Sequence, residues 1–195
     1  MDQKIEIPLS EKMKAISGFF GIRLTEEPEY KVLKQEDDFE VREYGELLLA
    51  TTFTGSTYET SSKKSFMRLA NYIFGGNQTH KKMAMTSPVF IENKLDGWMM
   101  TFVLSKNLDF QSLPTPDDNL VILSTEPSKK FAVMKYSATP NESLMNEMAA
   151  KLKSSIAMKQ QYRVVSEPRW AQYDGPKVIP FLRRNEVQIQ IESIQ

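Results

Sequence analysis

The chain has 195 residues, of which 41% are hydrophobic and 26% are charged, values that are usual for one folded domain. Its 25 basic residues balance 25 acidic residues, so no net charge favours nucleic acid or an anionic membrane as a partner. Cysteine is absent and His80 is the single histidine, which excludes disulfides, thiol nucleophiles and multi-histidine metal centres. The composition therefore favours binding over catalysis.

We expect residues 1–28 to form an N-terminal tail and residues 29–195 to form the folded domain. Residues 15–22 of the tail are mostly apolar and follow two lysines, so we expect a short amphipathic segment that packs on the domain. This stretch is too short for a signal sequence and lacks its cleavage site. No apolar run is long enough to cross a membrane. The expected location is the cytoplasm, with an exported form left open.

Short runs of β-branched and aromatic residues, separated by turn-forming residues, predict nine strands. The run nearest the C-terminus is the clearest, because Val187, Ile189 and Ile191 alternate with polar residues in the period of a half-buried strand. The expected strands are residues 39–44, 47–54, 88–92, 98–105, 120–124, 131–137, 162–165, 170–173 and 186–191.

Two capping boxes predict two helices between these strands. The first opens at Ser56 with Glu59 three residues later, and the second opens at Thr139 with Glu142 three residues later. Pro140 would then stand at the first helical position, which suits proline. Both helices carry apolar residues at helical spacing, so each is expected to pack one face on the sheet.

The two predicted helices belong to a repeated pattern, because similar residues recur at the same separation along the chain in the strand before each helix, at its start and in its apolar face. From this we infer two pseudo-symmetric strand–helix–strand–strand repeats, at about residues 39–105 and 120–192, which merge into a distorted β-barrel of the α+β class. The paired positions are Phe53 with Tyr136, Ser56 with Thr139, Leu69 with Leu152 and Ile73 with Ile156.

One edge of the first helix carries the candidate binding residues. At about 100° per residue, Lys63, Met67 and Phe74 project close together beside the apolar stripe. An apolar edge with a cation suits a flat hydrophobic ligand that bears carboxylates. The alternative, which is the commoner one for such a stripe, is that Lys63 covers apolar surface and that its two neighbours are packing at the rim.

Two other polar features are weaker candidates. His80 follows a glycine-rich helix stop, so we expect it in a surface loop, although it is the one candidate for an axial iron ligand. Arg183 and Arg184 precede the last strand. They either hold an anion or, as we favour, tie this strand to neighbouring turns through hydrogen bonds and ion pairs.

Five stretches, taken in this order and spacing, resemble the SOUL haem-binding protein family between about residues 29 and 191. The resemblance implies a distorted barrel of two pseudo-symmetric halves, each with one helix. It also implies binding of haem or another tetrapyrrole over the first helix, by apolar contacts and by basic groups at the propionates. The stretches are residues 39–44 (FEVREY), 72–77 (YIFGGN), 83–89 (MAMTSPV), 113–118 (LPTPDD) and 183–187 (RRNEV).

The family's helix positions transfer to this sequence one by one. Lys63 keeps a basic group, and Phe66 stands where the family can have methionine. Asn71 stands where a basic residue can occur, so one charge partner of the propionates is missing. His80 matches no histidine that is general to the family, so the resemblance implies no iron ligand. It favours porphyrin binding or buffering over turnover.

Two other functions stay open. The topology resembles bacterial effector-binding domains, which favours a small-molecule-sensing or protein-interaction module that uses the same groove. The N-terminal tail is too short for a helix-turn-helix unit, so no nucleic-acid partner is expected, and no protein partner is indicated. The third possibility is a hydrolase that uses acidic and tyrosine groups in the barrel.

Overall fold

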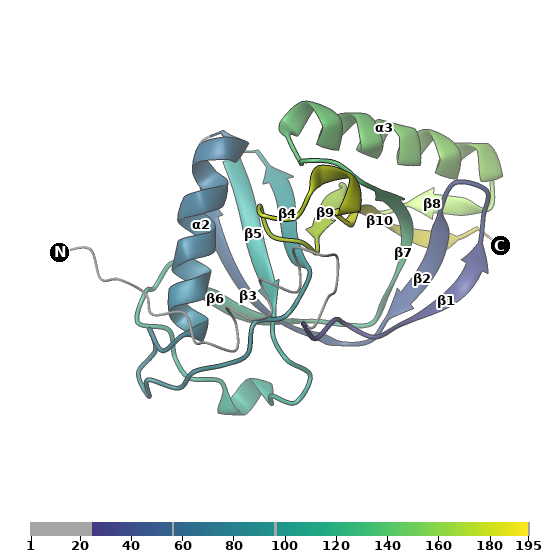
Figure 1. Cartoon of the computed structure of the whole chain (residues 1–195). Coiled ribbons are helices and arrows are strands. Elements are labelled where there is room, and N and C mark those ends of the chain that lie inside the picture. Colours follow the sequence, from purple (N-terminus) through teal and green to yellow (C-terminus); the bar gives the residue numbers. More distant parts are fainter. Residues whose placement is uncertain (1–24, 56, 96, 195) are drawn as a thin grey trace.

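The computed structural model describes residues 25–55, 57–95 and 97–194 and shows two helices packed on one curled antiparallel sheet (Figure 1). The helices are α2 (Tyr58–Ile73) and α3 (Glu142–Lys159), and the short 3-10 turns are η1 (Phe110–Ser112) and η2 (Pro180–Leu182). The predicted α+β class and the barrel-like sheet are confirmed. The amphipathic segment expected at residues 15–22 lies outside the described residues.

Every one of the nine expected strands overlaps a strand of the structure. The strand that sequence reasoning missed is β1, which is exposed along its whole length and therefore has no hydrophobic period to reveal it. In chain order the strands are β1 (Tyr30–Gln35), β2 (Glu40–Tyr44), β3 (Leu47–Thr54), β4 (Val89–Lys94), β5 (Gly97–Val103), β6 (Ile122–Glu126), β7 (Lys129–Tyr136), β8 (Tyr162–Val164), β9 (Arg169–Gln172) and β10 (Asn185–Ser193).

The observed starts of the helices correct both predicted capping boxes. The N-cap of α2 is Thr57, whose side chain makes no capping hydrogen bond. The N-cap of α3 is Asn141, whose Oδ1 accepts a hydrogen bond from the backbone N–H of Leu144 at 2.9 Å. Asparagine is a stronger N-cap than threonine, and a residue before proline favours extended backbone, so Thr139 stays outside the helix.

The strand order of the sheet is symmetrical about one central pair of strands. The order is β1-β2-β7-β10-β9-β4-β5-β3-β6, with β8 attached to β10. On one side of the β9–β4 pair lie β10 and then β7, and on the other side β5 and then β3 hold the corresponding places. The next strand outward comes from the opposite half of the chain in each case, because β2 pairs with β7 and β6 pairs with β3. Two related halves would give this order, and the duplication itself stays a prediction.

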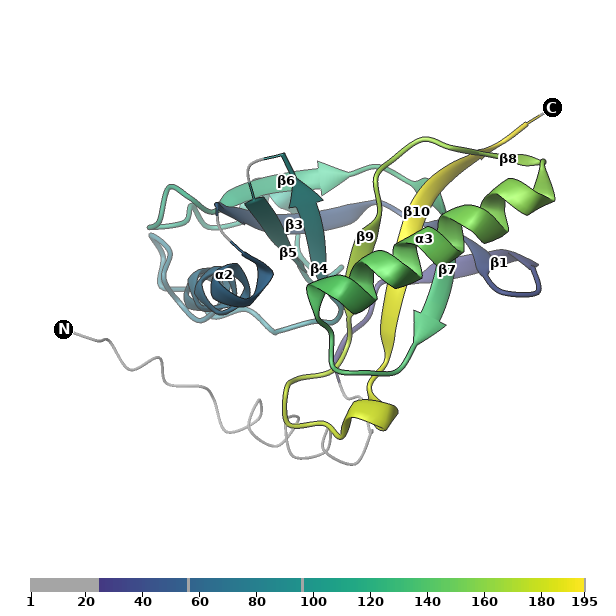
Figure 2. The same ribbon diagram turned by 90° about the horizontal axis from the view of Figure 1, so that it is seen from above.

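The main hydrophobic core lies between the helices and one face of the sheet. Leu69 and Ile73 of α2, and Leu152 and Ile156 of α3, are almost fully buried in the same cluster. α2 covers β3 and β5, and α3 covers β7, β8 and β10 (Figure 2). Trp170 of β9 donates a hydrogen bond from Nε1 to the carbonyl of Met145 in α3 at 2.9 Å, and its ring lies 5.9 Å from that of Trp98 in β5, which links the two halves.

The other face of the sheet carries a buried polar network centred on Glu186 of β10. Successive residues of a strand point to opposite faces, so Glu186 points away from the helix-covered core that contains Val187. The Glu186 side chain is fully buried and pairs with Arg42 of β2 at 3.1 Å. Tyr173 donates its hydroxyl to the same carboxylate at 3.0 Å. This network ties β2 and β10 to Tyr173, the residue after β9, on that face of the sheet.

Candidate ligand-binding site

The predicted binding edge lies on the exposed side of α2. Lys63 and Met67 are one helical turn apart and therefore share a face. Lys63 is exposed and has no ion-pair partner within the described ranges, and Met67 is 45% exposed. Phe74, the C-cap residue of α2, is partly buried and packs against the main core. Lys63, which has no ion-pair partner among the described residues, thus lies next to accessible apolar surface, and its role in binding stays a prediction.

The other two residues carried over from the resemblance are engaged with the protein itself. The Phe66 ring packs edge-to-face on Phe102 of β5 with 5.3 Å between centroids, so it anchors the helix as well as bordering the edge. Asn71 is exposed, and its side chain lies against Gly76, where an added Cβ would come within 2.2 Å of Asn71 Nδ2. Neither residue offers a second positive charge to a ligand.

The α2 edge is an open surface rather than a closed cavity. One hollow beside α2 is a gap of about 10 Å³ on the inner side of the helix, between Tyr58, Ser65 and the β4–β5 hairpin, whereas Lys63 and Met67 are exposed on the outer side. A ligand at Lys63 and Met67 would therefore lie on the protein with one face toward solvent. Binding there depends on the apolar area that is covered and on charge pairing, not on enclosure.

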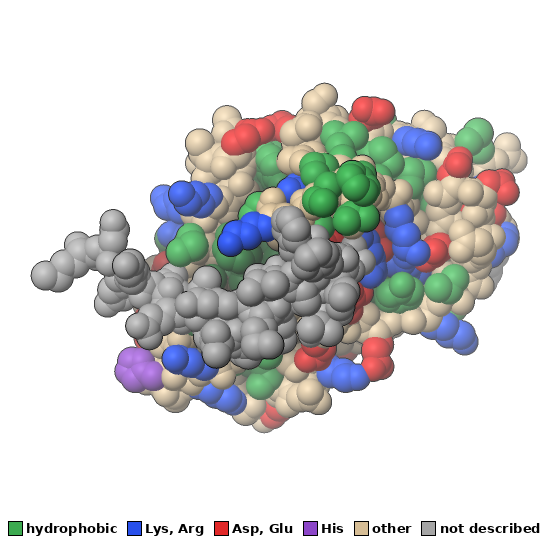
Figure 3. Space-filling model, in the orientation of Figure 1, with side chains coloured by type: hydrophobic (Ala, Val, Ile, Leu, Met, Phe, Trp, Pro, Cys, Tyr) green, Lys and Arg blue, Asp and Glu red, His purple; other side chains and the backbone are tan. Residues whose placement is uncertain are grey.

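His80 lies in the surface loop that the sequence predicts. It is exposed, has a positive φ of 52°, and its Nδ1 lies 3.3 Å from the carbonyl oxygen of Gly75 (Figure 3). Among the residues that the structure describes, no group of three or more histidine and carboxylate side chains is arranged to hold a metal ion. An axial role for His80 stays a prediction.

The arginines before the last strand tie it to its surroundings, the alternative that we favour from the sequence. Arg183 donates from Nε to the carbonyl of Val178 at 2.8 Å, and from Nη1 to the hydroxyl of Thr139 at 3.2 Å. Arg184 pairs with Glu186 at 3.1 Å and with Glu27 at 2.9 Å. Both guanidinium groups thus hold neighbouring segments together.

The hydrolase alternative requires acidic and tyrosine groups in the barrel, and the structure buries Glu186, Tyr44 and Tyr173 on the sheet. Burial raises the pKa of Tyr44 to about 12, and the nearby Glu186 carboxylate adds to that rise. Burial and the same carboxylate also raise the pKa of Tyr173. Both phenols therefore stay protonated at neutral pH, and the Glu186 oxygens are occupied by Arg42, Arg184, Tyr173 and Gln188. The arrangement holds the sheet and leaves no free base for a substrate.

A second exposed apolar surface, on η2, was missed by sequence reasoning. Hydrophobic side chains gather over this turn on the face of the molecule that also shows α2 (Figure 3). The exposed fractions are 37% for Ile179, 71% for Phe181 and 40% for Leu182. The signal in the sequence is the apolar stretch around Pro180, which lies in a loop and so follows neither the helical nor the strand period.

Comparison with known proteins agrees with this fold and with the sequence resemblance. The sequence profile of the SOUL heme-binding protein family matches residues 25–190. This chain belongs to the SOUL haem-binding protein family. Heme-binding protein 1 of Xenopus tropicalis and that of Xenopus laevis are each 31% identical to it over 166 residues, covering 80% of this chain and 86% of theirs.

Solved structures share the fold of this SOUL family member at much lower sequence identity. The C-terminal domain of EcmrR superposes with a TM-score of 0.59 at 16% identity and covers 85% of this chain and 99% of that domain. A hydrolase from Listeria innocua superposes with a TM-score of 0.51 at 9% identity and covers 82% of this chain and 94% of that chain. These likenesses establish the architecture alone. Within the described residues, neither α2 nor α3 has the length and apolar character that crossing a bilayer requires.

Proposed function

We propose that this protein binds haem or another tetrapyrrole reversibly at the α2 edge and carries or buffers the porphyrin without transforming it. Membership of the SOUL family and the two Xenopus relatives named for haem binding support the ligand class. The observation that carries the proposed location is that Lys63, which has no ion-pair partner among the described residues, shares one helix face with the exposed Met67. We place the protein in the cytoplasm and propose no nucleic-acid partner.

The chemistry of the edge matches a planar dicarboxylate. The macrocycle would cover Met67 and Phe74 and gain about 25 cal/mol for each Å² of apolar surface removed from water. Lys63 would meet one propionate as a charge-assisted hydrogen-bond donor. Asn71 leaves the second propionate without a fixed cation at that position, so we expect a modest affinity, on the order of micromolar.

Binding at this edge does not depend on iron. His80 lies in a loop against Gly75, and the resemblance carries no axial ligand to this chain. The same apolar and propionate contacts are available to a metal-free porphyrin. Catalysis is not part of the proposal, because the buried Glu186 is fully paired and the tyrosines around it stay protonated.

A titration with haemin tests this function through two matched lysines. We expect a saturable shift of the Soret band at about one equivalent, and Lys63→Glu should raise the dissociation constant about five- to tenfold because a carboxylate would repel the propionates. Lys64→Glu is the control, since it makes the same charge change about 100° around the helix. No saturable shift, or equal weakening by both variants, would contradict the proposal.

A further inference from the structure

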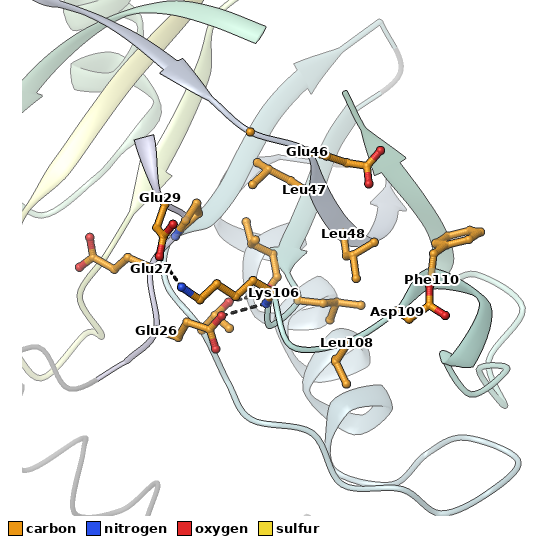
Figure 4. Close-up of a pocket in the computed structure, with 15 residues that line it drawn as sticks. Glu26, Glu27, Glu29, Glu46, Leu47, Leu48, Lys106, Leu108, Asp109 and Phe110 are labelled. Atoms are coloured by element: carbon orange, nitrogen blue, oxygen red, sulfur yellow. Dashed lines mark hydrogen bonds and ion pairs between the residues drawn. The ribbon is translucent and has the colours of Figure 1, made fainter. Parts of the chain in front are cut away.

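A second hollow lies at one end of the sheet, away from the α2 edge. It has a volume of about 300 Å³, at the lower end of the range of small-molecule sites (Figure 4). The start of β3, the end of β5, η1 and the segment before β1 form its wall. These four segments are far apart in the sequence, and the fold brings them together.

The floor of the hollow is apolar. Leu47 and Val103 belong to a buried cluster on one face of the sheet, whereas Leu48, Leu104 and Leu108 belong to or pack against the main core. Phe110, in η1, is 42% exposed and stands at the side of the hollow. A ligand with a small apolar group therefore has a preformed surface on which to rest.

The rim carries five carboxylates against one lysine, Lys106. Three of the carboxylates are already paired. Glu26 accepts hydrogen bonds from the hydroxyl of Ser105 at 2.6 Å and from the backbone N–H of Lys106 at 2.8 Å. Glu27 pairs with Arg184 at 2.9 Å, and Glu29 pairs with the Lys106 ammonium. Among the described residues, the one cation that lines the rim thus already has a carboxylate partner.

The remaining two carboxylates lie at the other side of the hollow. Glu46 has no hydrogen-bond or ion-pair partner among the residues that the structure describes, and Asp109 accepts a long hydrogen bond of 3.4 Å from the backbone N–H of Gln111. Figure 4 shows both near Phe110 and Leu48, while the Lys106 side chain reaches away from them toward Glu29. The uncompensated negative charge therefore borders the apolar floor.

We propose that this hollow is a binding site for a small amphipathic organic cation, that is, an ammonium group on a short apolar or aromatic chain. Glu46 and Asp109 would attract the ammonium group from two sides of the Phe110 ring, which adds a cation–π contact, and the apolar chain would lie over Leu48 and Leu108. The same rim disfavours a ligand that carries carboxylates. This site is therefore distinct from the tetrapyrrole surface in place and in the sign of its ligand's charge.

Two probes that differ in charge test the proposal by two-dimensional ¹H–¹⁵N NMR of the full-length protein. 4-Phenylbutylammonium should shift the amide signals of residues 46–48 and 104–110 saturably, with a dissociation constant on the order of 0.1–1 mM. 5-Phenylpentanoate, which has the same apolar chain and the opposite charge, should bind at least about tenfold more weakly. Equal binding of the two probes, no saturable shift, or shifts centred elsewhere would overturn the proposal.

Matched variants locate the charge recognition. Glu46→Gln should weaken binding of the cation about fivefold, and Asp109→Asn should do the same while it keeps the oxygen that caps η1. Glu147→Gln, the same kind of change at an exposed position of α3, should leave binding unchanged. Haemin affinity should be the same in Glu46→Gln and the wild type. Unchanged cation binding in both rim variants would contradict the assignment, whatever the haemin titration shows.

Discussion

Replacing Glu186 by alanine should lower the free energy of unfolding by about 3–5 kcal/mol. The side chain is fully buried, and its carboxylate accepts hydrogen bonds from Arg42 at 3.1 Å and from Tyr173 at 3.0 Å. Gln188 and Arg184 donate to it at 3.0 and 3.1 Å. Removing the acceptor would take away the fully buried counter-charge of Arg42 and leave it only the partly exposed Glu40, whose carboxylate lies 2.6 Å away.

Urea denaturation followed by tryptophan fluorescence measures this effect. Because small domains are stable by only about 5–15 kcal/mol, the variant should unfold at a much lower urea concentration. Glu192→Ala provides the control on the same strand, since Glu192 is about half exposed and pairs with Arg163 at the surface. We expect that control to change stability by less than about 1 kcal/mol. Similar losses in both variants would contradict a structural role for the network.

Met67→Glu should weaken haemin binding about tenfold, which corresponds to about 1.4 kcal/mol. The change removes exposed apolar surface from the α2 edge and puts a carboxylate one helical turn from Lys63, where the propionates are expected. Folding should be little affected, because Met67 is nearly half exposed.

Met158→Glu is the matched control for this variant. Met158 is a methionine on α3 that is 71% exposed, so the substitution changes the same atoms on a different helix. Its haemin affinity should equal that of the wild type in the same Soret titration. Equal losses in both variants would show a general effect of net charge, and an unchanged affinity of Met67→Glu would remove Met67 from the site.

The strands and helices were predictable because their signals are local. Alternation revealed β10, and helical spacing placed Lys63 and Met67 on one face of α2. The strand β1 was not predictable, because an edge strand that is exposed throughout has no buried face. The start of α3 was misplaced because two capping residues, Thr139 and Asn141, compete within three positions and the stronger cap lies nearer the helix.

The strand order, the hollow and the buried network were not predictable, because they depend on contacts between segments that are distant in the sequence. The exchange of β2 and β6 between the halves is decided by strand pairing, which no local pattern specifies. The hollow between Glu46 and Asp109 was missed for the same reason, since its wall comes from four separate segments. The motif at residues 183–187 did indicate that the last strand is tied to its neighbours, but not that Glu186 is the centre of a buried network.

The most direct test of the tetrapyrrole site is the position of bound haemin, read from paramagnetic broadening of backbone amide signals by its ferric iron. We expect broadening at sub-stoichiometric haemin to be strongest along α2, from Lys63 to Phe74, with the gallium porphyrin as the diamagnetic control. We also expect weak or absent broadening at α3, which covers a different part of the sheet from α2 (Figure 2). Broadening centred on the hollow at Glu46, on α3, or spread evenly over the chain would contradict the account.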